Sequence, residues 1–250
     1  EGAAWQSTEV VIVRDEGALQ EMVRRLEAAQ WISFDLETDS LERLSAGIVG
    51  FCLAVEPPTA YYVPVGHLRG AAQADSGQMN LFAGSSELAS GQLPIGRVVE
   101  AIRPAMTNPT IFKVAHNAKF DCMILERHGI QAYPVKFDTM IAEWLTDPST
   151  KHKGLKDLSR HRLGAEMTEI EDLIGRGKNQ VTFGEVPIEV AAPYGAADAD
   201  MTLRLLPPLQ QELEEKGLTK LIDMEMELLP VIADMERAGV RIDTDFFRHM

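Results

Sequence analysis

The stretch Trp31 to Leu41, WISFDLETDSL, is an apolar segment that carries two carboxylates, Asp35 and Glu37. In a β-strand the side chains at i and i+2 lie on one face, so these carboxylates would point the same way, roughly 6–7 Å apart. At an effective dielectric constant near 20, their repulsion would cost about 2.4 kcal/mol. The pair therefore predicts one of two arrangements. Either water or a basic side chain offsets the repulsion at a strand end, or a divalent-metal site lies at the carboxyl end of a central strand.

The chain has 250 residues, of which 45% are hydrophobic and 25% are charged, as in an ordinary soluble protein. Its length allows one large α/β domain, or one domain and part of another. It has no apolar run of membrane-spanning length and no secretory signal, so we expect a cytoplasmic protein without a membrane partner. Because it starts at Glu1 and its last ten residues are typical of an unfinished helix, we expect a fragment. Cys52 and Cys122 lack C-x-x-C spacing, which predicts small buried residues rather than a disulfide or zinc site.

The formal net charge of −14 argues against a protein that coats nucleic acid, because such domains carry a basic surplus. An enzyme that holds one strand end stays compatible with this charge, since bound metal cations would supply local positive charge. Basic residues gather between Lys151 and Arg162. This cluster predicts either a solvated helix face or a phosphate-contacting patch.

The pattern of apolar residues predicts strands at 8–14, 31–37, 47–55, 60–65, 111–115 and 135–137. It predicts helices at 16–29, 96–106, 118–128, 138–145, 155–163, from Pro187 onward, and at 219–238. Three sequential strands without an intervening helix imply that part of the sheet is antiparallel. Asn117 is expected to cap the helix 118–128. The segment 69–93 is rich in small and polar residues and predicts a flexible insertion.

Three further residues are candidates for the same site as Asp35 and Glu37: Asp121, Tyr194 and Asp198. Asp121 falls in the first turns of a helix that starts at the carboxyl end of a predicted strand. Tyr194 and Asp198 are four residues apart and so lie on one helical face. Each of them alone is most often just solvated or packed. Together with Asp35 and Glu37, in this chain order, they resemble the DEDD exonuclease superfamily, in the subclass whose third motif is Y-x-x-x-D.

Four motifs sharpen this resemblance: DLETDSL (35–41), HNAKFD (116–121), GRGKNQVTF (175–183) and YGAADADMTLRL (194–205). They are similar to the proofreading domain of bacterial DNA polymerase I, family A, and ERAGVRID (236–243) resembles the start of that family's polymerase domain. The resemblance implies a 3′–5′ exonuclease domain over 1–217, with 69–93 as a flexible insertion, and the beginning of the polymerase domain over 218–250. It also implies a ribonuclease-H-like α/β fold with a mixed five-stranded sheet, its second strand antiparallel, flanked by helices.

The activity implied by the resemblance is hydrolysis of the last phosphodiester at a DNA 3′ end, with two divalent metal ions, Mg²⁺ or Mn²⁺, as cofactors. Asp35 would bridge both ions. Glu37 and Asp198 would hold the ion that activates water, and Asp121 would reach the second ion, largely through waters. Tyr194 would orient the attacking water, because a phenol with a pKa near 10 is a poor base at pH 7.

The same resemblance implies residues that contact a single-stranded or frayed primer end. Leu41 matches the position of an apolar wedge against the terminal bases, and Asn117 matches a residue that contacts the bound strand. His116 stands where relatives often have Gln. The remaining expected substrate contacts are Thr38, Phe120, Lys178, Asn179 and Gln180. The other partner that the resemblance implies is the rest of the polymerase chain.

Two alternatives to a DNA exonuclease remain open. One is a catalytically silent nucleic-acid-binding domain, of the kind found in relatives that have lost carboxylates, and the presence of all four carboxylates argues against it. The other is an RNA exonuclease of the ribonuclease D type. The ERAGVRID tail argues against this alternative, because it resembles the start of an appended polymerase domain.

Within the insertion, Gln78-Met79-Asn80-Leu81-Phe82 places apolar residues in a small and polar segment. Leaving such side chains in water costs roughly 1.5–3 kcal/mol each, so we expect Leu81 and Phe82 to dock. They either fold back onto the domain or bind a partner. QMNLF resembles the peptide by which bacterial replication proteins bind the sliding clamp, in which Gln78 would fill a polar site and Leu81 and Phe82 a hydrophobic pocket. A flexible tether on both sides suits that role.

Overall fold

The computed structural model describes residues 7–69, 87–132 and 134–250, apart from the side chain of Asn179. Its central element is a six-stranded mixed sheet with the order β1-β4-β3-β2-β5-β6. The strands are β1 (Glu9–Ile12), β2 (Trp31–Thr38), β3 (Ile48–Glu56), β4 (Thr59–Pro64), β5 (Phe112–Ala115) and β6 (Val135–Asp138). β3 runs antiparallel to both of its neighbours, and the other pairings are parallel.

The sheet corrects the expected strand number, which was five. The additional strand is β1, which pairs in parallel with β4, with Glu9 opposite Thr59 and Ile12 opposite Tyr62. The β-branched residues of this segment favour such an edge strand, as the local pattern predicted. The antiparallel strand is β3. It is the second strand, as expected, when β1 is left out of the count.

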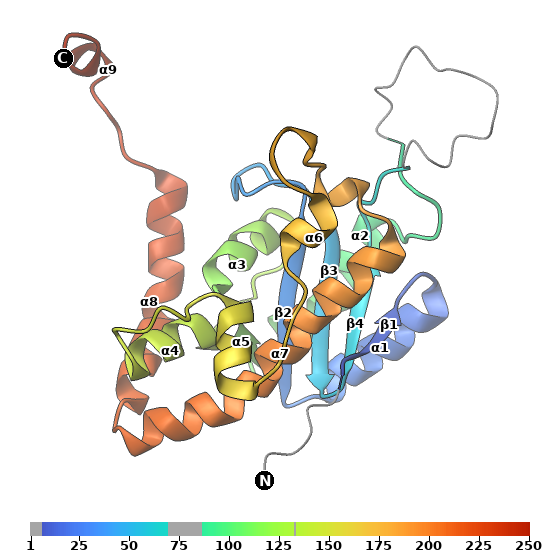
Figure 1. Ribbon diagram of the computed structural model, residues 1–250, viewed down its shortest axis with the longest axis horizontal. Helices are drawn as coiled ribbons and strands as arrows, with labels where there is room; N and C mark the ends of the chain where they lie inside the picture. The colour runs from blue at the N-terminus through green and yellow to red at the C-terminus, as the bar shows by residue number, and fades with distance from the viewer. Residues whose placement is uncertain (1–6, 70–86, 133) are drawn as a thin grey trace.

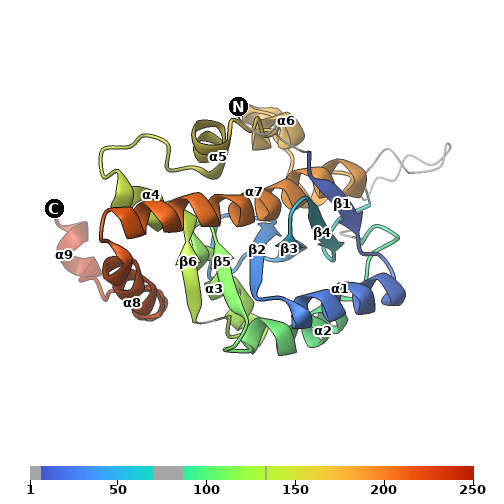
Figure 2. The same ribbon diagram turned by 90° about the horizontal axis from the view of Figure 1, so that it is seen from below.

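Helices cover both faces of the sheet (Figures 1 and 2). On one face lie α1 (Glu16–Ala28), α2 (Ile95–Thr107) and α3 (Ala118–Arg127), and along the other runs α7 (Ile188–Glu215). The side of α7 also carries α4 (Thr139–Thr146), α5 (Leu155–Leu163) and α6 (Ile170–Ile174), followed by the turns η2 (Gly177–Asn179) and η3 (Phe183–Glu185). The chain then continues from α7 into α8 (Thr219–Ala238) and α9 (Thr244–Arg248). Among the described helices, none has the length and apolar character needed to cross a membrane.

A single buried carboxylate, Asp138, caps two helices. It accepts hydrogen bonds from the N–H groups of Asn117 (3.2 Å) and Ala118 (2.7 Å) at the start of α3. It also accepts from Met140 (2.9 Å) and Ile141 (3.2 Å) in the first turn of α4. The expectation that Asn117 caps α3 is therefore wrong. Asn117 has a left-handed backbone with φ of 62°, its side chain makes no cap hydrogen bond, and Asp138 satisfies the amides instead.

The described ends of the 69–93 insertion are tied to the domain. Leu88 forms an antiparallel bridge with Leu68. The Gln92 side chain accepts from the backbone N–H of His67 and donates to its carbonyl oxygen, both at 2.8 Å. The predicted clamp-binding residues Gln78, Leu81 and Phe82 lie outside the described residues.

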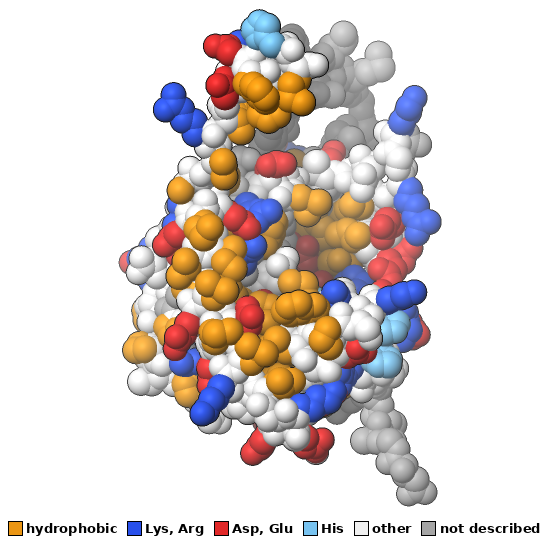
Figure 3. Space-filling view, turned by 90° about the vertical axis from the view of Figure 1, so that its left-hand side faces the viewer, with side chains coloured by type: hydrophobic (Ala, Val, Ile, Leu, Met, Phe, Trp, Pro, Cys, Tyr) orange, Lys and Arg blue, Asp and Glu red, His pale blue; other side chains and the backbone are white. Residues whose placement is uncertain are grey.

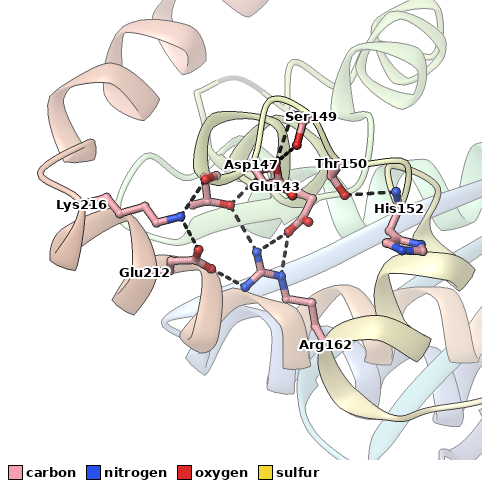
Figure 4. Close-up of polar contacts among 9 residues, drawn as sticks. Glu143, Asp147, Ser149, Thr150, His152, Arg162, Glu212 and Lys216 are labelled. Carbon is pink, nitrogen blue, oxygen red and sulfur yellow. Dashed lines mark hydrogen bonds and ion pairs between the residues drawn. The ribbon is translucent and has the colours of Figure 1, made fainter.

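An ion-pair network joins α4, α5 and α7 (Figure 4). Arg162 of α5 pairs with Glu143 of α4 at 2.6 Å and also with Glu212 of α7. Glu143 is 1% exposed. Lys216 pairs with Glu212 and donates to the Thr146 carbonyl, both at 2.7 Å. Helix α5 is thus fixed relative to α7, which matters because both helices contribute to the site described next.

Candidate active site

The four predicted carboxylates converge near the carboxyl end of β2. Asp35 and Glu37 come from β2, Asp121 from the first turn of α3, and Asp198 from the middle of α7. Glu37, Asp121 and Asp198 are all buried, with exposed fractions of 7%, 3% and 9%. Residues separated by more than 160 positions in the sequence therefore form one cluster of negative charge.

Burial raises the pKa of every carboxyl group in this cluster, and the neighbouring carboxylates raise it further. The pKa of Asp35 rises to about 8, with Asp198 adding to the effect of burial and Lys156 opposing it. The pKa of Glu37 lies well above its usual range, with Asp35 as the largest neighbouring cause. Burial and then Asp35 also raise the pKa of Asp121. For Asp198, burial raises the pKa and Lys156 opposes the rise. Bound cations would relieve this repulsion.

The carboxylate oxygens of the cluster fit a hard divalent cation. Carboxylate oxygens of Asp35 and Glu37 and the sulfur of Cys52 all lie within 4.8 Å of one another. The Oε1 atom of Glu37 is buried and has no hydrogen-bond partner in the part of the chain that the structure describes. A buried oxygen without a partner is costly, and metal ligation would satisfy it. Carboxylate oxygens are the ligands that Mg²⁺ and Mn²⁺ prefer.

Helix α7 approaches the sheet closely at Gly195. A Cβ atom at this position would come within 2.5 Å of the Cys52 sulfur and 3.1 Å of Glu37 Oε1. The absence of a side chain at Gly195 therefore lets this turn of α7, which also carries Tyr194 and Asp198, reach β2 and β3. Cys52 is fully buried, as predicted, but the sequence did not indicate that its thiol lies beside the carboxylates.

Tyr194 is held beside the carboxylates by two contacts. Its ring centroid lies 5.9 Å from that of Phe183 and 4.1 Å from the Nζ atom of Lys156. The same Nζ atom donates to both carboxylate oxygens of Asp198, at 2.9 and 3.3 Å. Burial, and then the neighbouring carboxylates, raise the pKa of Tyr194 above its ordinary value. The phenol therefore stays protonated and can act as a hydrogen-bond donor but not as a base.

Lys156 belongs to the basic cluster 151–162, and its position in the site was not expected from the sequence. Arg160 and Arg162 of that cluster pair with carboxylates of their own, so neither expected role of the cluster describes it as a whole. The local sequence does not separate Lys156 from its neighbours, and the inward direction of its side of α5 is visible only in the structure. Ser159 is a small residue three positions later, and its full burial shows that this side of α5 faces inward.

The predicted substrate-binding residues near β2 and α3 differ in exposure. Leu41, in the loop after β2, is 87% exposed, as a wedge against bases would need to be. Asn117 is also exposed. Thr38 donates to the carbonyl oxygen of Ser40 at 2.8 Å, and Phe120 packs against the core. Contacts of these four residues with a nucleic acid remain predictions.

His116 is engaged within the protein. Its Nδ1 atom lies 2.8 Å from the Thr139 hydroxyl, and the ring also hydrogen-bonds the backbone of Lys153. Burial lowers its pKa. Lys178 and Gln180 are exposed in the loop after α6, which lies at the end of the sheet where β2 ends (Figure 1). Substrate contacts by His116, Lys178, Asn179 and Gln180 remain predictions.

Comparisons of the sequence with known proteins agree with this arrangement. A family model described as 3′–5′ exonuclease matches residues 10–214. DNA polymerase I of Chloroflexus aurantiacus is 43% identical over 245 residues, which cover 96% of this chain and 24% of that protein. The chain thus spans about a quarter of the length of the curated relatives it matches.

Solved structures share the fold. The Pol1 structure of M. smegmatis, in complex with DNA primer-template and dNTP, has a TM-score of 0.69 at 16% identity, covering 96% of this chain and 34% of that one. Escherichia coli RNase D, an exoribonuclease, has a TM-score of 0.63 at 15% identity, covering 91% of this chain and 51% of that one. At these identities the likeness concerns the fold, and it confirms the predicted ribonuclease-H-like class.

Proposed function

This chain belongs to the 3′–5′ exonuclease domain family of bacterial DNA polymerase I, and from that membership we propose that it removes nucleotides from DNA 3′ ends as a proofreading domain. The observation that supports this most directly is the cluster of four carboxylates at the end of β2, three of them buried, in which one Glu37 oxygen has no partner among the described residues. The preferred substrate is a single-stranded or frayed primer end, and the reaction takes place in the cytoplasm.

The exonuclease family depends on divalent metal ions, and the cluster offers the ligands for them. We propose two ions, Mg²⁺ or Mn²⁺, with Asp35 shared between them, Glu37 and Asp198 on one side and Asp121 on the other. When bound, such ions neutralise charge on the phosphate and lower the pKa of an attacking water.

Tyr194 and Glu37 orient the water in this proposal. The protonated phenol of Tyr194 donates a hydrogen bond to the water oxygen, and a Glu37 carboxylate oxygen accepts one from the water. The water oxygen attacks phosphorus and releases a proton to solvent, the bond from phosphorus to the 3′ oxygen of the preceding nucleotide breaks, and that oxygen takes up a proton. The products are a nucleoside monophosphate and a strand that is one nucleotide shorter and ends in a 3′ hydroxyl. Positioning of this kind supplies a large share of the rate enhancement in hydrolytic enzymes.

We also propose a division into an exonuclease domain (1–217) and the beginning of a polymerase domain (218–250), in which helix α8 packs on the nuclease with its inner side and offers its outer side to the rest of the polymerase. The outer side of α8 exposes Met224, Leu228, Val231 and Met235, at successive spacings of four, three and four residues. Figure 3 shows hydrophobic side chains gathered on the side of the molecule that carries α8. An apolar stripe over three helical turns is typical of an interface. We assign this stripe to contact with the rest of the polymerase chain.

The test is digestion of 5′-labelled single-stranded DNA and RNA, with Mg²⁺ or with EDTA. We expect Mg²⁺-dependent shortening of DNA from the 3′ end, and loss of it in Asp35→Ala and Glu37→Ala. Asp157→Asn, which changes an exposed carboxylate of α5, is the matched control and should retain activity. Digestion of RNA in preference to DNA would favour an enzyme of the ribonuclease D type. No digestion of either would favour a silent binding domain.

We also propose that QMNLF binds the sliding clamp, on the sequence resemblance alone. A binding titration of the chain against the clamp of the same organism tests this proposal. Equal binding by the Leu81→Ala, Phe82→Ala double variant, or no binding by the parent, would contradict it.

A further inference from the structure

Lys156 is a cation placed inside the carboxylate cluster. It lies in the first turn of α5, and its ammonium group donates to both oxygens of Asp198, at 2.9 and 3.3 Å. The side chains of Lys156 and Asp198 are only 15% and 12% exposed. An ion pair this well shielded from water responds strongly to the loss of one partner, because the other charge is left uncompensated.

The same ammonium group contacts Tyr194. Its Nζ atom lies 4.1 Å from the ring centroid, within the range of a cation–π contact. Tyr194 and Asp198 are one helical turn apart on α7, so a single lysine from another helix touches both. Lys156 therefore fixes the relative placement of the two α7 side chains that the proposed reaction uses.

The charge of Lys156 also reaches beyond its direct contacts. It opposes the unfavourable effect of burial on the ionised forms of Asp35 and Glu37, as it does for Asp198. A divalent cation bound to these carboxylates would have the same effect with twice the charge. The ammonium group and such a cation would repel each other, and they would compete for the carboxylate oxygens of Asp198.

We propose that Lys156 is a positioning residue that competes with the divalent metal ion for Asp198 and keeps the site assembled while the metal is absent. This inference rests on the proposed function, because it concerns the metal site of that function. In the metal-free protein, Lys156 holds Asp198 and Tyr194 in place. When a metal ion binds, Asp198 gives up at least one of its two hydrogen bonds to Lys156. Metal affinity is then lower than the four carboxylates alone would give.

Calorimetric titration of the 250-residue chain with Mn²⁺, without nucleic acid, tests this competition. Lys156→Met is expected to bind Mn²⁺ about tenfold more tightly than the parent. Its melting temperature in EDTA is expected to fall by about 5–10 °C, because Asp198 loses its partner. Lys156→Gln, which keeps hydrogen-bond donors but not the charge, should also bind Mn²⁺ more tightly, and it provides the test if the Met variant does not fold. Lys156→Arg keeps the charge and should resemble the parent in Mn²⁺ affinity.

Lys153→Met is the matched control, because it removes an exposed positive charge three residues earlier. It should leave both the Mn²⁺ affinity and the melting temperature unchanged. A lysine with a purely structural role would lower the melting temperature without tightening Mn²⁺ binding. If the parent binds Mn²⁺ and neither uncharged variant binds it more tightly, the inference is overturned. If the parent does not bind Mn²⁺ at all, the metal site of the proposed function fails as well, so the two failures can be told apart.

Discussion

Asp35 of β2 and Cys52 of β3 are direct partners in the antiparallel register of the sheet. Their side chains lie on the face that α7 covers, and a Cβ atom on Gly195 of that helix would lie 2.5 Å from the Cys52 sulfur. Three elements thus meet at one point beside the carboxylates. The distance between α7 and β3 depends on the small size of Gly195 and Cys52 at this contact. The position of Asp198 relative to Asp35 depends on that distance.

Gly195→Ala tests this contact. We expect it to lower the free energy of unfolding by about 1–3 kcal/mol, the usual cost of overpacking, and to weaken Mn²⁺ binding by moving α7 outward. Adding Cys52→Ala removes the nearest atom and should restore part of the stability, as thermal unfolding of the three variants will measure. Gly96→Ala is the control, because no atom lies within 4 Å of its Cβ position in α2. A Gly195→Ala protein as stable as the parent would contradict the close approach.

Tyr194→Phe tests the role of the phenol. We expect it to leave Mn²⁺ affinity unchanged and to lower the rate of 3′-end digestion by about 10–1000-fold, the range for losing one positioning hydrogen bond. The ring contacts with Phe183 and Lys156 do not need the hydroxyl, so the fold should persist. Single-turnover digestion at saturating Mg²⁺ is the measurement. Parental turnover in the Phe variant would rule out this role.

The pKa of Asp35 predicts how the stability of the metal-free protein depends on pH. The pKa rises from an ordinary value of 3.8 to about 8 on folding, so the folded state binds more protons than the unfolded state between these values. This contribution to stability is complete below pH 4 and is lost as the pH rises toward 8. In EDTA the melting temperature should therefore fall between about pH 5 and pH 8.

Asp35→Ala should flatten this fall in EDTA and raise the melting temperature at about pH 8, because it removes one of the mutually repelling carboxylates of the cluster. In Mn²⁺ the order should reverse, since the parent gains stability from binding that the variant lacks. Differential scanning calorimetry of both proteins in EDTA and in Mn²⁺ makes the comparison. If the melting temperature of the parent protein changes with neither pH nor Mn²⁺, the physical support for a metal site is lost.

Arg162→Leu tests the network that joins α4, α5 and α7. It leaves Glu143, which is 1% exposed, without its partner, and we expect a loss of about 3–5 kcal/mol. Arg160→Leu, on the same helix, removes a residue whose side chain is 44% exposed and should cost at most about 1 kcal/mol. Urea unfolding of both variants measures the difference. Equal losses would show that the buried network contributes no more than a surface pair.

The fold was predictable where local patterns decide the structure. The apolar periodicity of the segments that form β2, α5 and α8 gave their limits to within one residue. The sixth strand was present in the local pattern, and only the resemblance to a family suggested five. The cap of α3 was not predictable, because the residue that supplies it, Asp138, lies 20 positions further along the chain. The preference for Asn at N-cap positions favours Asn117 there. This preference considers only residues next to the helix, so it cannot predict a cap from Asp138.

The site shows the same division. The shared face of Asp35 and Glu37 follows from strand alternation, and that of Tyr194 and Asp198 follows from helical spacing, whereas their grouping with Asp121 in one site rested on the resemblance to a family. Lys156 could not be distinguished from other cations in 151–162, because only the docking of α5 against α7 brings its ammonium group to Asp198. The proximity of Cys52 depends on the pairing of β2 with β3, and the sequence contains no local signal for that register.

The segment that matches the family model is shorter than the segment that folds as one unit. The match to the exonuclease family ends at residue 214, yet α8 buries Ile222, Met226, Leu229 and Ala233. Its Glu236 also pairs with Lys119 of α3, at 2.6 Å. A protein shortened to residue 217 would therefore lose part of its own core and expose new apolar surface on the nuclease. An isolated nuclease should therefore extend to the end of α8, beyond which residues 239–250 are all exposed.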